Sequence, residues 1–282
     1  MLYDNQAELC SDRFGRSCSV SDESITMPYD QRTYRSYSAS PGLVSFTAGV
    51  QETDLFISAH SDLSSQAGTA IQDVRAVIED YIRARPDFKT SLVSIASDQQ
   101  AHEVIRDMLE ASRACGVGPM AAVAGAVAEY VSRALFEYSP EIIVENGGDL
   151  FFKTDRELTI GIFAGLSPLS EKIGLRIAPQ TLPFSLCTSS GTVGPSLSYG
   201  QADAVTVRSS SAALADAAAT AIGNMITQTS DISAGIQAAR SIEKLDGIVI
   251  IKDDQIGAWG DMELVALENG ASVKDAHPTD SI

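Results

Sequence analysis

LCTSSGTVGPSLSYGQADAVTVRSSSAALADAAATAIGN, residues 186–224, is the stretch that decides the fold. It opens with a loop of hydroxyl and glycine residues, 188–192, whose small side chains let backbone N–H groups approach an anion closely. The alternating residues 202–207 predict a strand, and the alanine-rich run 211–224 predicts a helix. The loop is therefore expected to be a binding surface at the junction of a strand and a helix.

Within the predicted helix, Asp216 and Thr220 are four residues apart and lie on the same face. A carboxylate and a hydroxyl directed at one centre suit Mg²⁺, which prefers oxygen ligands and takes one or two carboxylates. The ordinary alternative is that Asp216 is solvated and Thr220 bonds back to its own helix. The surrounding alanines leave little bulk near the pair, which favours a ligand or another backbone packed against it.

The charge balance limits the partners that the chain can bind. Its 282 residues include 37 acidic and 20 basic ones, and the formal net charge is −17. Nucleic acid and anionic membranes require clustered Lys and Arg, which this sequence lacks, so we expect neither partner. A phosphorylated ligand would be held by backbone amides, helix ends or a metal.

Cysteine and histidine usage indicates no disulfide framework and no zinc site. These residues are scattered: Cys10, Cys18, Cys115, Cys187, His60, His102 and His277. Cys187 adjoins the hydroxyl loop, but a buried small hydrophobe is favoured over a nucleophile because no histidine lies nearby in sequence. No apolar run approaches a membrane span and the first residues lack a signal-peptide pattern, so a cytoplasmic protein is expected.

Hydrophobic periodicity predicts the remaining elements. Helices are expected at 67–85, 97–114 and 120–136. Strands are expected at 35–38, 43–50, 53–59, 141–145, 150–152, 158–163, 172–177, 184–187, 248–251 and 255–259. Because strands come in clusters and helices in a block, the class is α+β with mixed or mainly antiparallel sheets packed with helices. We expect a loosely ordered arm at 1–29, one domain at 30–268 and a flexible tail at 269–282.

Two more glycine motifs have alternative interpretations. Residues 116–121, GVGPMA, match G-x-G-x-x-A but follow a predicted helix, so a Rossmann site is excluded. Gly118 either opens a helix whose free N–H groups hold an anion or allows close helix packing. Residues 146–149, NGGD, lie between two apolar runs and predict a hairpin turn, with a ligand-binding loop as the alternative.

Four segments resemble, in the same order, a bacterial and archaeal family of ApbE-like proteins. They are GVGPMAAVAGAVAEYV (116–131), VENGGDLFF (144–152), CTSSGTVGPSLSYG (187–200) and ADAAATAIGN (215–224). That family is related to the ApbE flavin transferases, which move FMN from FAD onto a threonine of a target protein with magnesium. The resemblance spans most of residues 30–260 and implies an ApbE-like fold.

The resemblance also implies roles for individual residues. The A-D-x-x-x-T helix of the transferases falls on Asp216 and Thr220, which are the implied magnesium ligands. Asp149 and Asp216 are the catalytic candidates. The implied contacts to FAD or FMN come from the helix start, the G-G-[DE] turn and the T-S-G loop: Gly118, Asn146, Gly147, Gly148, Asp149, Thr188, Ser189, Ser190 and Gly191.

Two departures from the transferase pattern keep a second function open. The lysine of a K-G pair is absent at Ala124-Gly125, and Gly200–Asp203 replaces an H-x-x-D-P segment. Loss of a cation near a pyrophosphate removes about 3–4 kcal/mol of transition-state stabilisation. The first hypothesis is a magnesium-dependent phosphoryl (FMN) transferase acting on a small-molecule nucleotide and an acceptor protein. The second is a flavin- or nucleotide-binding carrier or sensor without transfer activity, and a scaffold ranks third. The oligomeric state stays open, with a dimer as one alternative.

Overall fold

The structure is a computed structural model that describes residues 42–180, 182–193 and 198–267. All of these residues belong to one unit of the chain, 32–282. The predicted arm, the predicted strand 35–38 and the predicted tail lie outside the described residues. Cys10, Cys18 and His277 lie outside them as well.

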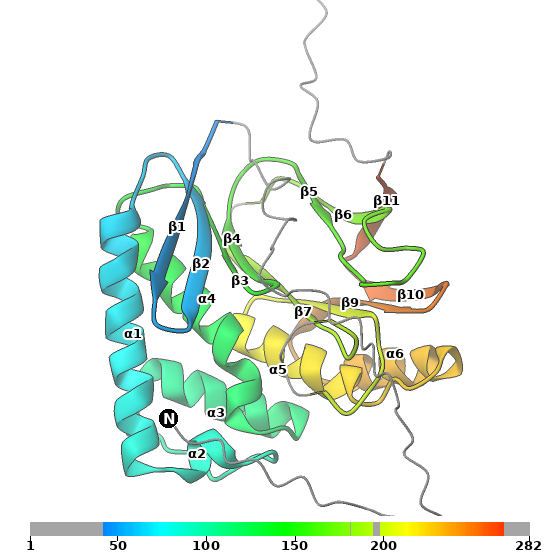
Figure 1. The fold of residues 1–282 in the computed structure, drawn as a ribbon, viewed down its shortest axis with the longest axis horizontal. Coiled ribbons are helices and arrows are strands. Elements are labelled where there is room, and N and C mark those ends of the chain that lie inside the picture. The colour runs from blue at the N-terminus through cyan, green and yellow to red at the C-terminus, as the bar shows by residue number, and fades with distance from the viewer. Residues whose placement is uncertain (1–41, 181, 194–197, 268–282) are drawn as a thin grey trace, which may run out of the picture. The chain divides into compact units, whose positions relative to one another are not determined.

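An eight-stranded antiparallel sheet forms the centre of the fold, in the order β1-β2-β3-β4-β7-β8-β9-β10 (Figure 1). Its strands are β1 (Val44–Val50), β2 (Thr53–Ala59), β3 (Ile142–Asn146), β4 (Asp149–Lys153), β7 (Phe184–Ser189), β8 (Ala204–Ser209), β9 (Leu245–Lys252) and β10 (Gln255–Gly260). A second antiparallel sheet has the order β11-β6-β5. Its strands are β5 (Leu158–Gly161), β6 (Ile173–Ile177) and β11 (Glu263–Ala266).

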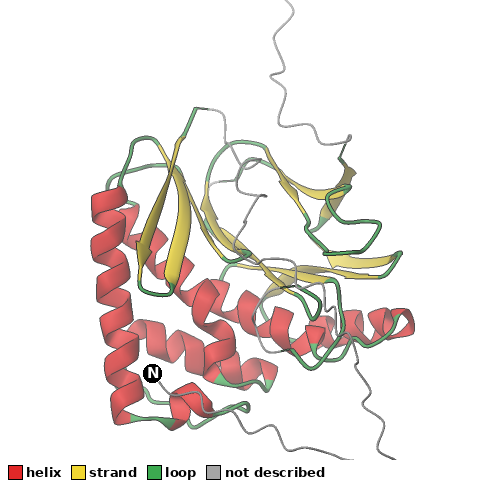
Figure 2. Cartoon of the chain, in the orientation of Figure 1, coloured by secondary structure: helices red, strands yellow, loops and turns green. Residues whose placement is uncertain are grey.

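The helices lie on one side of the large sheet, and the small sheet lies on the other (Figure 2). They are α1 (Ser64–Ala84), α2 (Asp87–Thr90), α3 (Glu103–Cys115), α4 (Val123–Leu135), α5 (Ala212–Gly223) and α6 (Ile232–Ser241), with 3₁₀ turns η2 (Pro119–Ala122) and η3 (Thr229–Asp231). The predicted α+β class with mainly antiparallel sheets is confirmed.

Strand alternation separates two hydrophobic cores on opposite faces of the large sheet. Cys187 and Val205 face the helices and belong to the larger core. Their strand neighbours Leu186 and Ala204 face the small sheet and belong to the second core. A side chain on β4, β7 or β8 can therefore be assigned to one face from its position along the strand.

Three features differ from the sequence predictions for physical reasons. The helix predicted from residue 97 begins at Glu103, because His102 Nδ1 accepts the N–H of Val104 at 3.4 Å and so caps the helix there. We missed α6, which buries Ile232, Gly235 and Ala239; a Cβ on Gly235 would lie 2.8 Å from Ile250 Cδ1. We also missed β11, whose four residues are held by pairing with β6.

Helix length and composition bear on membrane spanning. Among the described residues no single helix is both long and apolar enough to cross a bilayer. The segments Glu103–Cys115 and Pro119–Leu135 meet that test only as a pair, and the pair is bent by 107°.

Candidate functional site

One stripe of α5 carries the predicted metal ligands. Asp216, Thr220 and Gly223 follow the spacing i, i+4, i+7 and lie on the same helix face. The helix begins at a capped end, since Ser211 Oγ accepts the N–H of Leu214 at 3.3 Å. Its alanines are almost fully buried, so α5 packs closely against the large sheet and α4.

Asp216 is a partly buried cap on a neighbouring helix rather than a solvated side chain. Its Oδ2 accepts the N–H of Gly125, at the start of α4, at 2.9 Å. A Cβ on Gly125 would lie 2.4 Å from Ala212 O and 3.0 Å from Asp216 Cβ, so this approach requires glycine. Burial raises the pKa of Asp216 to about 7, although hydrogen bonds from Gly125 and Ala124 act in the opposite direction.

Two hydroxyl groups lie along the α5 stripe. Within the described residues, Thr220 Oγ1 and Ser189 Oγ make no hydrogen bond, so the back-bonded alternative for Thr220 is not observed. Ser189 on β7 lies next to the end of the α5 stripe, since a Cβ on Gly223 would be 3.8 Å from Ser189 Oγ. Thr220 is one turn before Gly223. It therefore lies on α5 between Asp216, which contacts α4, and Gly223, which lies near Ser189 of β7.

Asp149 begins β4 and points toward the helices. Gly147 and Gly148 have φ values of 67° and 108°, and Asn146 pairs with Asp149 across them, which confirms the predicted hairpin turn. Asp149 is opposite Cys187 in register, is only 6% exposed, and accepts the N–H of Thr188 on Oδ1 at 3.2 Å. Burial raises the pKa of Asp149 well above its ordinary value, and the negative charge of Asp216 raises it further.

We call Asp149, Cys187 and Asp216 the acidic junction. In the described part of the chain neither carboxylate has an ion-pair partner. The Cys187 thiol donates to Ala212 O at 3.5 Å, and its pKa is raised well above the ordinary value by burial and then by both aspartates. The thiol is therefore unreactive, and the interpretation of Cys187 as a buried small residue agrees with the structure.

Two polar groups of the hairpin turn are hydrogen-bonded within the protein. Gly148 N–H donates to Glu145 Oε1 at 3.0 Å, and Asn146 Nδ2 donates to Ala124 O at 3.0 Å. The Asn146 contact joins the turn to the start of α4, which brings the turn and the Gly125–Asp216 contact into one neighbourhood. Gly147 is exposed and remains accessible to a ligand.

Side chains of the hydroxyl loop, residues 188–192, point to different faces of the large sheet. The side chain of Thr188 points away from the acidic junction, toward the second core, and its Oγ1 lies 2.9 Å from Thr206 Oγ1. Ser190 Oγ accepts two N–H groups of its own loop, and Gly191 N–H donates to Ala202 O at 2.9 Å. Ser189 is thus the hydroxyl of this loop that faces α5.

Gly118 packs closely against the segment that follows α2. It precedes η2, and a Cβ there would lie 1.9 Å from Ser91 O. This contact supports the packing alternative for Gly118.

Two residues at the site were not singled out from the sequence. Glu129 on α4 is only 7% exposed, and its Oε2 accepts the N–H of Ala212 at 2.8 Å. A signal was present, since Glu129 is a single carboxylate within the apolar run GAVAEYV. The sequence places Gly125 at the position of the K-G pair but does not indicate its contact with Asp216, because that contact depends on how two helices cross.

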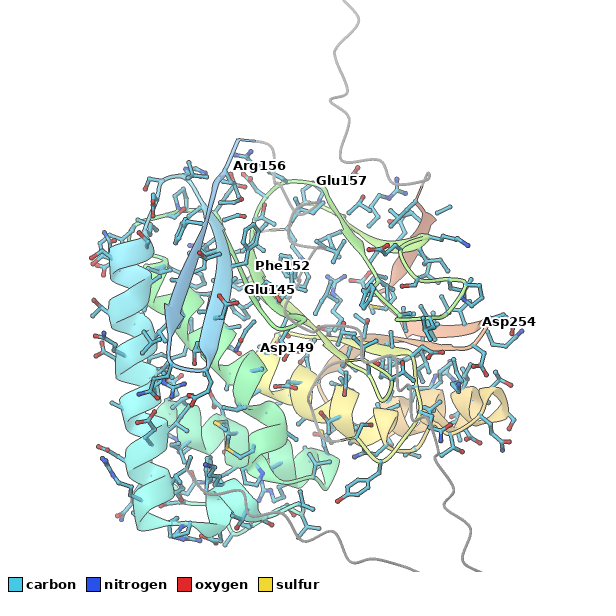
Figure 3. All side chains as sticks on the ribbon, viewed as in Figure 1. Glu145, Asp149, Phe152, Arg156, Glu157 and Asp254 are labelled. Atoms are coloured by element: carbon cyan, nitrogen blue, oxygen red, sulfur yellow. The ribbon has the colours of Figure 1, made fainter. Side chains whose placement is uncertain are left out.

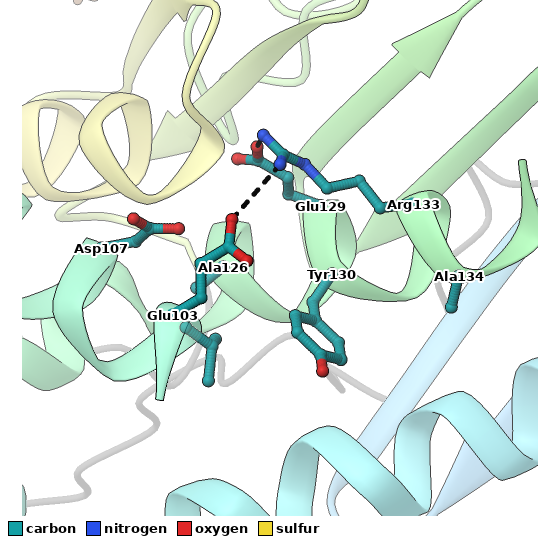
Figure 4. A pocket seen from close by; sticks show the side chains of 8 residues that line it. Glu103, Asp107, Ala126, Glu129, Tyr130, Arg133 and Ala134 are labelled. Atoms are coloured by element: carbon teal, nitrogen blue, oxygen red, sulfur yellow. Dashed lines mark hydrogen bonds and ion pairs between the residues drawn. The ribbon is translucent and has the colours of Figure 1, made fainter. Parts of the chain in front are cut away.

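A separate cavity of about 230 Å³ lies between α3 and α4 (Figure 4). Its lining residues are Glu103, Val104, Asp107, Ala126, Glu129, Tyr130, Arg133 and Ala134. None of the predicted site residues lines it. Burial raises the pKa of Asp107, with further contributions from the charges of Glu129 and Glu103.

Comparison with known proteins identifies the family. The family model described as AbpE bacteria matches residues 36–246. The chain belongs to this family. A UPF0280 protein of Methanococcus aeolicus is 37% identical over 217 residues, which is 75% of this chain and 88% of that protein. A UPF0280 protein of Methanosarcina acetivorans is 37% identical over 214 residues, covering 75% and 84% of the two chains.

A solved structure supports the ApbE-like fold of this AbpE family member. The flavin transferase ApbE of Vibrio cholerae, in a mutant form, superimposes with a TM-score of 0.52 and 12% sequence identity. The match covers 77% of this chain and 97% of the transferase. At this identity the likeness establishes the fold alone.

The departure from H-x-x-D-P has a steric counterpart in this member of the AbpE family. A Cβ on Gly200 would lie 1.9 Å from Gly223 O and 2.9 Å from Ile226 O. The loop therefore packs directly on the end of α5, and no side chain fits at position 200 with this backbone.

Proposed function

We propose that this protein binds a flavin nucleotide or a similar diphosphate with Mg²⁺ and transfers the FMN phosphoryl group to an acceptor. The observation that carries the proposal is the acidic junction, in which the buried Asp149 and the partly buried Asp216 have no cationic partner among the described residues, and Thr220 lies one turn from Asp216. Strongly perturbed carboxylates of this kind concentrate at functional sites. The ApbE-like fold supports the choice of chemistry.

The oxygen donors near Asp216 fit magnesium. The described residues contain no group of three or more His, Cys, Asp or Glu side chains arranged to hold a metal. Asp216 and Thr220 would supply protein oxygen ligands to the ion, and water and phosphate oxygens would supply the others. A magnesium ion bound there would neutralise charge on the phosphoryl oxygens.

The transfer step requires a proton acceptor near the acceptor hydroxyl. The hydroxyl oxygen forms a bond to the phosphorus of the FMN half of FAD, the P–O bond to AMP breaks, and AMP leaves with the electron pair. Asp149 takes the hydroxyl proton, a role that suits a carboxylate whose raised pKa makes it a stronger base. Ser189 and Thr220 orient phosphate oxygens by donating hydrogen bonds.

An AMP-release assay tests this proposal. Purified protein is incubated with FAD, Mg²⁺ and a candidate acceptor, and AMP is measured by chromatography. Asp216→Ala should abolish release, whereas Asp246→Ala, at an exposed position, should leave it unchanged. Release that persists in Asp216→Ala would contradict the assignment.

A non-catalytic carrier or sensor is the second candidate. The missing lysine near Gly125, the packed Gly200 and the engaged N–H groups of Gly148 and Gly191 favour it, because each removes a group that a transferase could use. Equilibrium binding of FAD or FMN without AMP release would support this alternative. Absence of binding with and without Mg²⁺ would exclude both functions.

A further inference from the structure

Helices α4 and α5 cap each other's first turns. Asp216 of α5 accepts the N–H of Gly125 at 2.9 Å, and Glu129 of α4 accepts the N–H of Ala212 at 2.8 Å. In each helix the two participating residues are four positions apart, so one turn of α4 lies against one turn of α5. Free N–H groups at a helix start favour a carboxylate, and here each helix obtains it from the other.

Glu129 makes a long-range contact with Ala212 that fixes the start of α5. Ser211 caps only its own helix, through Leu214 N–H. The Ala212 carbonyl accepts the Cys187 thiol and packs on Gly125, and the Ala212 side chain is buried in the larger core. Removal of the Glu129 carboxylate would therefore leave a buried N–H of Ala212 without its acceptor.

The charge of Glu129 is balanced separately from this cap. Its Oε1 pairs with Arg133, one turn further along α4, while Oε2 accepts the N–H of Ala212. The cap and the ion pair therefore use different oxygens and can be removed independently.

We infer that Glu129 is a positioning residue for Asp216, and its role in metal binding rests on the proposed function. By holding Ala212, it fixes the turn of α5 that carries Asp216 and so keeps that carboxylate on Gly125. Partners that orient a metal ligand typically affect metal affinity by about 10- to 100-fold when they are removed. Glu129 itself touches neither nucleotide nor metal in this scheme.

Four variants separate the cap from the ion pair. Glu129→Ala removes both, Glu129→Gln keeps an oxygen acceptor for Ala212 but loses the charge, and Arg133→Ala removes only the ion pair. Glu129→Asp keeps the charge but is one methylene shorter, so it provides a second test if the alanine variant does not fold. Circular dichroism first establishes that each variant is folded.

Amide hydrogen exchange at Gly125 gives a readout that does not depend on any ligand. We expect exchange at least about tenfold faster in Glu129→Ala, an intermediate value in Glu129→Asp, and wild-type protection in Glu129→Gln and Arg133→Ala. Equal Gly125 protection in all four variants would overturn the positioning role.

Calorimetric titration with FAD and Mg²⁺ gives the functional readout. Affinity should fall about 10- to 100-fold in Glu129→Ala and stay near wild type in Glu129→Gln. Equal affinities in these two variants would overturn the link to metal binding. Absence of FAD binding by the wild-type protein would overturn the proposed function, and faster Gly125 exchange in Glu129→Ala would then still establish that Glu129 positions Asp216.

Discussion

The buried carboxylates Glu141 and Asp149 lie at opposite ends of the β3–β4 hairpin and differ in how their charge is balanced. Figure 3 labels Asp149 and Arg156, the partner of Glu141. At one end is the charged cluster, which we define as His60, Glu141, Thr154 and Arg156. Glu141 is 8% exposed, and it accepts hydrogen bonds from Arg156 Nε at 2.9 Å and Thr154 Oγ1 at 3.0 Å, with His60 Nε2 at 3.1 Å. Burial alone would raise the pKa of Glu141, but its hydrogen bonds with Arg156, His60 and Thr154 hold that pKa below the ordinary value.

At the other end, the acidic junction has no such compensation among the described residues. Asp149 is 6% exposed and Asp216 is partly buried; burial raises the pKa of both, and no described cation lies beside them to lower it. Burial therefore does not distinguish a structural carboxylate from a functional candidate. The partners of the carboxylate do, because an uncompensated charge destabilises the fold and is retained where it serves a ligand.

The largest expected effect comes from removing charge at the acidic junction. Asp149→Asn keeps the shape of the side chain but cannot accept a proton, so AMP release should fall by about 10²- to 10⁴-fold, the usual contribution of a general base. The same change should raise the melting temperature at pH 8, because a carboxyl group whose folded pKa is raised costs stability at high pH and the amide does not titrate. Calorimetry and the AMP assay measure both effects. A lower melting temperature would show that Asp149 is structural, like Glu141.

The same chemical change in the charged cluster should have the opposite outcome. Glu141→Gln loses charged hydrogen bonds to Arg156 and His60, so the free energy of unfolding in urea should decrease by about 1–3 kcal/mol. Affinity for FAD per folded molecule should stay unchanged, since Glu141 lies at the far end of the hairpin. Glu137→Gln, at an exposed position, is the matched control. Weaker FAD binding in Glu141→Gln would remove the functional contrast between the two ends.

The fold could be predicted from sequence largely because its elements follow local rules. Strand alternation and the turn at Gly147-Gly148 were sufficient to predict the antiparallel β3–β4 hairpin. The helix start at Glu103 was missed, because a histidine cap determines it. This is a contact that periodicity does not encode.

The candidate site was predictable only in part, for a related reason. The stripe of Asp216 and Thr220 follows from helical spacing alone. The contact of Asp216 with Gly125 does not, since it depends on how α4 crosses α5. The orientation of Thr188 away from the junction follows from its strand register, which could not be assigned before the end of β7 was known.

The acidic junction and the charged cluster should change the stability of the protein in opposite directions as the pH rises. The folded pKa of Asp216 is about 7 against a model-compound value of 3.8, so between these values the folded chain holds protons that the unfolded chain has released. The contribution of the acidic junction to stability should therefore decrease as the pH rises from about 4 to 7. The contribution of Glu141 behaves oppositely, because it is present above pH 4.5 and is lost as the pH falls through the lower folded pKa.

Melting temperatures measured from pH 3 to 8 would resolve these opposing contributions, with shifts of a few degrees expected for about 1 kcal/mol. Asp216→Asn should flatten the decrease between pH 4 and 7, and Glu141→Gln should flatten the loss of stability at the acid end. Each variant serves as the control for the other, because each removes one titration and leaves the second in place. If both variants altered the same part of the pH profile, the titrations of the two ends of the hairpin would be coupled. The acidic junction could then not be distinguished from the charged cluster.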